Sequence, residues 1–257
     1  MKKLYILLLG MVALLMSSCY THHAIGYLQD PNKCKDLPVY DSVPYEPYRI
    51  HVNDEIIYRI VTLDETISKM LGANSSGYSA GQYANSYRVY ADGTIDLPFL
   101  KPLKIVGLTE QEAQDTLRAA FREIIPDADV KLALYNKTFS VIGDAHSGQY
   151  SIYKEKMNIF QALAMTGDVM NSGDRRNIRI IRPRDFGQEP EVLEFDIRTN
   201  SIIDSKYYYV YPNDVIYVAR TPNSFYAVPS YTGFIGLVTS SVALLTTVLN
   251  YFAVLYK

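Results

Sequence analysis

The chain has 257 residues, of which 48% are hydrophobic and 20% charged, a balance that suits one or two globular domains with a core. Its formal net charge of −2 excludes the global basic field that attracts nucleic acid. Tyrosine is abundant, with 23 residues, and tryptophan is absent. We interpret the tyrosines mainly as strand residues, with exposed rings that stack on sugars as the alternative use.

The N-terminus predicts an export signal. Two lysines precede an apolar run over residues 4–16, and Ser17, Ser18 and Cys19 follow it. A charged start, an apolar stretch of this length and small residues before a cleavage point make up a signal peptide. Because a cysteine comes directly after the small residues, the pattern resembles a bacterial lipoprotein signal, in which residues 1–18 are removed and Cys19 carries acyl chains. An ordinary signal peptide with an incidental cysteine is the alternative.

Residues 19–45 lack periodicity and are punctuated by prolines, which predicts a tether or an extended arm. Cys34 is the only other cysteine, so lipidation of Cys19 leaves it without a disulfide partner. We assign Cys34 no role.

A first unit of strands and one helix is predicted over residues 46–136. Asp92-Gly93 lies between two alternating runs and is a strong hairpin signal. Thr109 and Glu112 form a capping-box pattern at the start of a helix that Pro126 ends. One face of that helix is apolar, with Ala113, Leu117, Ala120, Phe121 and Ile124. The predicted strands cover residues 48–50, 55–63, the two sides of the hairpin within 87–100, and 129–135.

A second unit of the same kind is predicted over residues 137–228. Asn158 and Gln161 flank the start of a short apolar helix over 159–167, with Gly167 as its C-cap. The predicted strands cover residues 138–143, 177–183, 191–197, 207–211 and 214–219. Two units that each mix several strands with one helix define an α+β protein.

Sequence motifs for catalysis are weak. GYSAG at residues 77–81 has the spacing of a hydrolase nucleophile elbow, but polar residues flank it where that motif needs a strand and a helix. The histidines, His22, His23, His51 and His146, have no ligand cluster around them, and the sequence has no P-loop or dinucleotide fingerprint. We therefore predict no catalytic residue, no metal and no cofactor.

Two charged groups have competing interpretations. Asp54/Glu55 and Asp64/Glu65 are acidic neighbours at strand ends, and we interpret them as solvated turn charges rather than an acid/base pair. A cluster of arginines is interpreted as one solvated face, with a docking surface for an acidic partner or polymer as the alternative. The cluster consists of Arg175, Arg176, Arg179, Arg182 and Arg184.

Several stretches of the first unit together resemble the polysaccharide export domain of Wza-type outer-membrane proteins. The stretches are YRIHVNDEIIYRI, RVYADGTIDLPFL and KIVGLTEQEAQDTLRAAF, in which the matching positions are Tyr48, Arg49, Ile50, Asp54, Asp92, Gly93, Thr94, Ile95, Leu97, Pro98, Gly107, Leu108, Thr109, Glu112 and Ala113. Asn53 stands where the family usually has glycine.

The second unit resembles a soluble-ligand-binding β-grasp (SLBB) domain, through FSVIGDAHSGQY, NIFQALAMTGDV and YPNDVIYV. It departs from that pattern at Asp144, Ser147, Thr166 and Asp168. The two resemblances together cover residues 46–220. They imply an outer-membrane lipoprotein, with most of the chain in the periplasm, that exports capsular or exopolysaccharide and is not an enzyme.

Residues 229–257 are predicted to form an amphipathic transmembrane helix. No charged residue occurs between Arg220 and Lys257, and the segment is long enough to cross a bilayer. At about 100° per residue, small and polar side chains gather on one face. That face carries Thr232, Gly236, Thr239, Ser240, Ala243, Thr246, Thr247 and Asn250. A lone helix of this kind leaves its hydroxyl and amide groups facing lipid, whereas a ring of copies turns them toward a water-filled lumen.

The family resemblance implies such a ring, octameric by family analogy, in which these eight residues line the pore. An inner-membrane polysaccharide copolymerase is the implied partner that supplies energy. The alternative function is a periplasmic lipoprotein that binds glycan or a partner without forming a pore.

Overall fold

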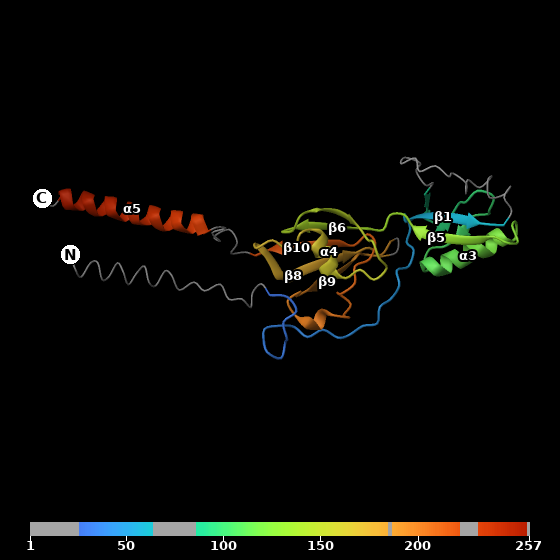
Figure 1. The fold of residues 1–257 in the computed structure, drawn as a ribbon, viewed down its shortest axis with the longest axis horizontal. Helices are drawn as coiled ribbons and strands as arrows, with labels where there is room; N and C mark the ends of the chain where they lie inside the picture. The colour runs from blue at the N-terminus through green and yellow to red at the C-terminus, as the bar shows by residue number, and fades with distance from the viewer. Residues whose placement is uncertain (1–25, 64–85, 185–186, 222–230, 256–257) are drawn as a thin grey trace.

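The computed structural model describes residues 26–63, 86–184, 187–221 and 231–255. These residues form two mixed α/β units and a separate C-terminal helix, in agreement with the predicted α+β class. Figure 1 shows the second unit between the first unit and the C-terminal helix. Each unit has its own buried apolar cluster, which in the first unit falls within residues 50–134 and in the second within 139–218.

The first unit is a three-stranded antiparallel sheet, ordered β2-β1-β5, with a helix packed on it and a short two-stranded ladder beside it. The elements are β1 (Glu55–Val61), β2 (Tyr87–Arg88), β3 (Thr94–Ile95), β4 (Leu103–Lys104), α3 (Glu110–Arg122) and β5 (Asp129–Leu134). The predicted capping box at Thr109 and Glu112 is confirmed, and α3 buries Ala113, Leu117 and Phe121 of its predicted apolar face. Ile124, predicted on the same face, lies beyond the end of α3 and is exposed.

The predicted hairpin at Asp92-Gly93 is right about the turn and wrong about the pairing. Asp92 Oδ1 accepts hydrogen bonds from the backbone N–H and the hydroxyl of Thr94, at 2.9 and 2.7 Å. The flanking segments then diverge, because β2 pairs with β1 while β3 pairs with β4. A local turn signal cannot specify these partners, because β1 precedes the turn by about thirty residues and β4 lies beyond the segment that the hairpin would occupy.

The second unit is a five-stranded mixed sheet, ordered β7-β6-β10-β8-β9, in which only β6 and β10 run parallel. Its strands are β6 (Thr138–Gly143), β7 (Gly148–Ser151), β8 (Gly173–Arg182), β9 (Glu191–Phe195) and β10 (Val215–Arg220). The helix α4 (Ile159–Met165) starts at an Asn158–Gln161 capping box, and a short 3-10 helix, η2 (Asn200–Ile202), follows β9.

The strand predicted over residues 207–211 is wrong. The backbone turns at residues 206–208 and then makes a single antiparallel bridge between Tyr209 and Asn158, in which Ile159 N–H donates to Tyr208 O at 2.8 Å and Val210 N–H donates to Met157 O at 2.9 Å. A run rich in tyrosine and valine predicts a strand, but the rings of Tyr207 and Tyr208 pack against the core from a turn.

Substitution of Gly143, at the end of β6, is expected to destabilise the fold strongly. Its φ is +98°, and a Cβ there would lie 2.1 Å from the backbone oxygen of Val218 in β10. We expect Gly143→Ala to lower the free energy of unfolding by about 2–4 kcal/mol, because the clashing atom is backbone and cannot turn aside. Gly107 is the matched control, since its φ is +81° but nothing lies near its missing Cβ. Equal losses for the two variants in urea unfolding would contradict the clash.

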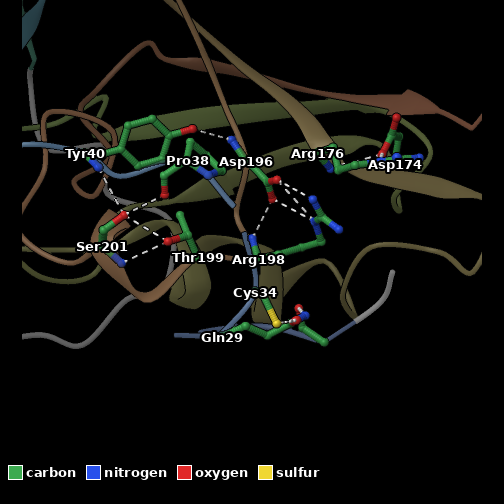
Figure 2. A network of polar contacts seen from close by, with 11 residues as sticks. Gln29, Cys34, Pro38, Tyr40, Asp174, Arg176, Asp196, Arg198, Thr199 and Ser201 are labelled. Carbon is green, nitrogen blue, oxygen red and sulfur yellow. Dashed lines mark hydrogen bonds and ion pairs between the residues drawn. The ribbon is translucent and has the colours of Figure 1, made fainter. Parts of the chain in front are cut away.

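Residues 26–47 form an extended arm that runs along the second unit to the first (Figure 1). Hydrogen bonds attach the arm to the second unit along its length. Tyr40 OH accepts from the backbone N–H of Asp196 at 2.8 Å, and Tyr40 N–H donates to the Ser201 hydroxyl at 3.1 Å (Figure 2). Gln29 N–H donates to Arg198 O. The segment predicted as a tether or an extended arm is therefore, over its described residues, an extended arm bound to the second unit.

Candidate functional site

The helix predicted near the C-terminus is present as α5 (Tyr231–Leu255). Every side chain described on it is exposed. The predicted pore-lining residues described there are Gly236, Thr239, Ser240, Ala243, Thr246 and Thr247, whereas the side chains of Thr232 and Asn250 lie outside the described residues. Within the described part of the chain, no helix combines the length and apolar character that crossing a bilayer requires.

The threonine hydroxyls of α5 have partners within the helix. Thr239 donates to Ile235 O at 2.9 Å, Thr246 to Ala243 O at 2.8 Å and Thr247 also to Ala243 O at 2.8 Å. Such back-bonding satisfies the hydroxyl proton and leaves only oxygen lone pairs facing outward. These three hydroxyl protons therefore need no acceptor outside the helix.

The junction between the two units contains two turns built alike. His51-Val52-Asn53-Asp54 precedes β1, and Tyr211-Pro212-Asn213-Asp214 precedes β10. In each turn the aspartate Oδ2 accepts the backbone N–H three residues earlier, at 2.8 Å, and the aspartate N–H returns to that residue's carbonyl, at 3.2 Å. Asn53 and Asn213 have φ of 70° and 67°. Asparagine tolerates this left-handed region, which explains why it replaces glycine at position 53.

A direct hydrogen bond joins the two turns. Asn213 Nδ2 donates to Asp54 Oδ1 at 3.1 Å, while Tyr48 OH donates to Asp54 Oδ2 at 2.8 Å. Asp54 is 1% exposed, so its interpretation as a solvated turn charge is wrong. Its neighbour Glu55 instead lies 3.5 Å from Arg88.

Asp214 is fully buried and paired with Arg182, whose Nε and terminal nitrogen donate to the two carboxylate oxygens at 3.0 and 2.9 Å. The guanidinium carbon of Arg182 lies 4.3 Å from the centre of the Tyr211 ring. Tyr45 and Tyr48 stack on that ring at 6.1 and 6.4 Å between centroids. The junction is thus a layered aromatic and ionic contact between the units.

The buried carboxyl groups of Asp54 and Asp214 should make the free energy of unfolding depend on pH. Burial raises the pKa of Asp54 and of Asp214 above the ordinary value of about 4. The stability they contribute is fully present below about pH 4 and is lost as pH rises through the raised folded pKa values.

We therefore expect Asp54→Asn to make the fall in unfolding free energy between about pH 4 and 7 shallower than in the wild type, in urea titrations at each pH. The matched control is Asp92→Asn. Hydrogen bonds from Thr94 lower the pKa of Asp92, so its contribution is present above the unfolded pKa and is lost only as pH falls below about 4. Parallel pH profiles for the wild type and Asp54→Asn would contradict the burial effect.

The arginine cluster does not form one solvated face. Arg175 is buried and donates to Val169 O at 2.9 Å, and Arg182 is held at the junction. The other arginines have carboxylate partners, in the pairs Arg176–Asp174, Arg179–Glu194 and Arg184–Glu191. Because its charges are paired internally, the cluster gains no support as a docking surface.

The remaining candidates lie apart from one another or outside the described residues. Cys19, His22, His23, Asp64/Glu65 and GYSAG are outside them. His51 lies beside Tyr48, with Nδ1 3.1 Å from the hydroxyl. Among the described residues, no three His, Cys, Asp or Glu side chains are grouped as metal ligands.

The sequence predicts a short turn at residues 52–54, but sequence reasoning missed that the Asn-Asp dipeptide recurs at residues 213–214 and that the two turns are bonded to each other. The repeated dipeptide before a strand was a readable signal, because asparagine followed by a strand-leading aspartate favours a left-handed turn with a side-chain cap.

The motif residues of the first unit specify its turns and caps. Asp54 and Asp92 accept turn N–H groups, Gly107 N–H donates to Ile50 O, and Thr109 caps α3. Residues 42–134, which contain these turns and caps, match the family of polysaccharide biosynthesis/export proteins. This match confirms the predicted resemblance to Wza-type export proteins over the first unit.

Two curated relatives extend the comparison. The chain is 28% identical over 149 residues to the EPS I polysaccharide export outer membrane protein EpsA of Ralstonia solanacearum, and 27% identical to the protein of that name from Ralstonia nicotianae. Each alignment covers 53% of this chain and 39% of the relative. The match thus spans well under half the length of these relatives.

Proposed function

We propose that the chain is an outer-membrane lipoprotein that forms a homo-oligomeric channel for export of capsular or exopolysaccharide. The observation that carries the proposal is the export domain over residues 42–134, whose family motif residues hold the turns and caps of the first unit. The relatives are named as outer-membrane polysaccharide export proteins. The lipoprotein-like signal over residues 1–18, followed by Cys19, fits the same location.

The second unit, with residues 137–228 as its proposed bounds, is proposed to be the SLBB-like β-grasp domain. Its sheet order, numbered within the unit, is 2-1-5-3-4, with a parallel central pair and a helix between the first hairpin and the third strand. That topology supports a β-grasp assignment. The arm and the junction hold this unit against the export domain, which suits a vestibule of fixed shape.

The proposed channel is formed by α5 from each subunit of a ring, octameric by family analogy. Apolar side chains are exposed on the helix, among them Ile235, Val238, Val242, Leu245 and Val248, and a solitary water-exposed helix leaves them uncovered. In a ring they face lipid or neighbouring helices. The threonine face then offers lone pairs to the hydroxyls of a passing polymer, and such weak contacts permit transport. An inner-membrane copolymerase would supply the energy.

The second candidate is a periplasmic lipoprotein that binds glycan or a partner without a pore. The specific observation in its favour is that no described helix has the character of a membrane span.

Mass measurement in mild detergent separates the two candidates. We expect the extracted wild-type protein to be a discrete oligomer of many subunits, and a monomer at every concentration would contradict the channel. In cells, Thr246→Leu combined with Asn250→Leu is expected to reduce export severalfold without changing the oligomer. The matched control is Val242→Leu with Val248→Leu, on the apolar face, which should leave export unchanged. Equal export by both double variants would mean that Thr246 and Asn250 do not line the lumen.

A further inference from the structure

A groove of about 630 Å³ lies beside the junction, with walls from both units. The first unit contributes the first turns of α3 and the end of β5. The second unit contributes Ile152, residues 154–156 and residues 210–212, the arm adds Tyr45, and Tyr48 follows at the start of the first unit. Its volume falls within the range typical of small-molecule sites.

The rim of the groove carries positive charge that the described residues do not neutralise. Lys154 and Lys156 are exposed there, and neither ammonium has a carboxylate within ion-pair distance in the described part of the chain. Lys156 Nζ lies 4.7 Å from the centre of the Tyr45 ring, a cation–π contact that holds it at the groove. Lys137, by contrast, is paired with Glu110, and the exposed carboxylate of Glu155 is the other acidic group on the rim.

The part of the groove that the first unit contributes offers amide and apolar side chains. Gln111 and Gln114 come from the first turns of α3, and Leu132 and Leu134 come from β5. Gln114 Oε1 accepts the backbone N–H of Leu132 at 3.2 Å, so the amide nitrogen of Gln114 remains as a donor toward the groove.

These groups match the chemistry of an acidic sugar. The C–H face of a sugar ring packs against aromatic and aliphatic side chains, its hydroxyls bond amides, and a uronate carboxylate pairs with an ammonium. An acidic peptide fits less well, because peptides bind strand edges through their backbone and Gln114 already occupies the Leu132 N–H on this edge.

We propose that this groove binds a short uronate-containing segment of the exported polysaccharide, with Lys154 and Lys156 as its carboxylate contacts. The inference rests on the proposed export function and specifies the chemical class of the polymer. Contacts through exposed ammonium groups are weak and salt-sensitive, so the polymer can be held briefly and released.

Calorimetric titration of the full-length protein in detergent tests the proposal. The probes are trigalacturonate, the neutral trisaccharide maltotriose and triglutamate. We expect trigalacturonate to bind at least tenfold more tightly than either of the others. Lys154→Gln with Lys156→Gln should weaken trigalacturonate binding about tenfold, and binding should also weaken as salt rises from 0.05 to 0.5 M.

Lys101→Gln with Lys104→Gln is the matched control, because both lysines are exposed, lie outside the groove lining and give the same change in net charge. It should leave the affinity within twofold of wild type. The proposal is overturned if folded wild-type protein does not bind trigalacturonate, if triglutamate binds equally well, or if the control loses as much affinity. It is also overturned if the Lys154/Lys156 variant changes the oligomer mass while its sugar affinity stays the same, since the groove would then be a subunit interface.

Deletion of the chain in cells distinguishes failure of the groove proposal from failure of the export function. If cells lacking the chain lose surface polysaccharide while the purified protein ignores trigalacturonate, export stands and the groove proposal is wrong. If surface polysaccharide persists without the chain, the export function is wrong whatever the titration shows.

Discussion

Replacing Cys19 by alanine is expected to release the protein from the outer membrane and to abolish polysaccharide export. Two or more acyl chains give stable anchoring, because each buried CH₂ contributes about 0.8 kcal/mol, and the variant has none of them. The measurement is immunoblotting of membrane and soluble fractions, together with surface polysaccharide.

Cys34→Ala is the matched control for this change. Cys34 is half-buried in the arm, where its thiol lies 3.7 Å from Gln29 Oε1, and its loss should leave both fractionation and export unchanged. A Cys19→Ala protein that stays in the outer membrane and supports full export would contradict lipid anchoring at this residue.

Replacing Asp214 by alanine is expected to lower the free energy of unfolding by about 3–5 kcal/mol, the usual cost of removing one member of a buried ion pair. The change leaves Arg182, 19% exposed, without its carboxylate, and leaves the N–H of Tyr211 without its acceptor. Chemical denaturation followed by circular dichroism measures the loss.

Two controls separate the buried pair from its surroundings. Glu194→Ala removes the carboxylate partner of Arg179, on the same strand as Arg182 but with both side chains about half exposed, and should cost less than about 1 kcal/mol. Asn213→Gly keeps a residue that tolerates the left-handed turn but removes the hydrogen bond to Asp54, so it tests the link between the units. Equal losses for Asp214→Ala and Glu194→Ala would show that burial of the pair is unimportant.

The parts of the fold that the sequence predicted are those with local causes. Both helices that pack on the sheets begin at capping boxes visible as Thr109–Glu112 and Asn158–Gln161, and β6 has the predicted bounds. Each of these depends on residues within a few positions of one another, so spacing alone specifies them.

The parts that were missed depend on contacts between distant segments. Asp54 looked like a surface turn residue because nothing near it in sequence reveals that Asn213, 159 positions later, donates to its carboxylate. The same holds for Tyr211, whose hydroxyl donates to Glu46 O in the arm. The tyrosines of residues 207–211 met the pattern of a strand but pack from a turn, since ring burial does not require an extended backbone.

For the candidate site, the sequence predicted the helix α5 and the residues of its polar face, but not the state of their hydroxyls. Whether a threonine bonds its own helix depends on the side-chain rotamer, and the residue type alone does not fix that. The sequence could not predict the groove either, because its walls come from five segments that are far apart along the chain.

The central claim is that this chain carries polysaccharide across the outer membrane. The direct measurement is the amount of polysaccharide on the surface of cells from which the chain has been deleted, compared with cells that regain it from a plasmid. Export by this chain predicts that deletion removes surface polysaccharide and that the restored chain returns it. Surface polysaccharide that persists at the wild-type level in the deleted cells would contradict the claim.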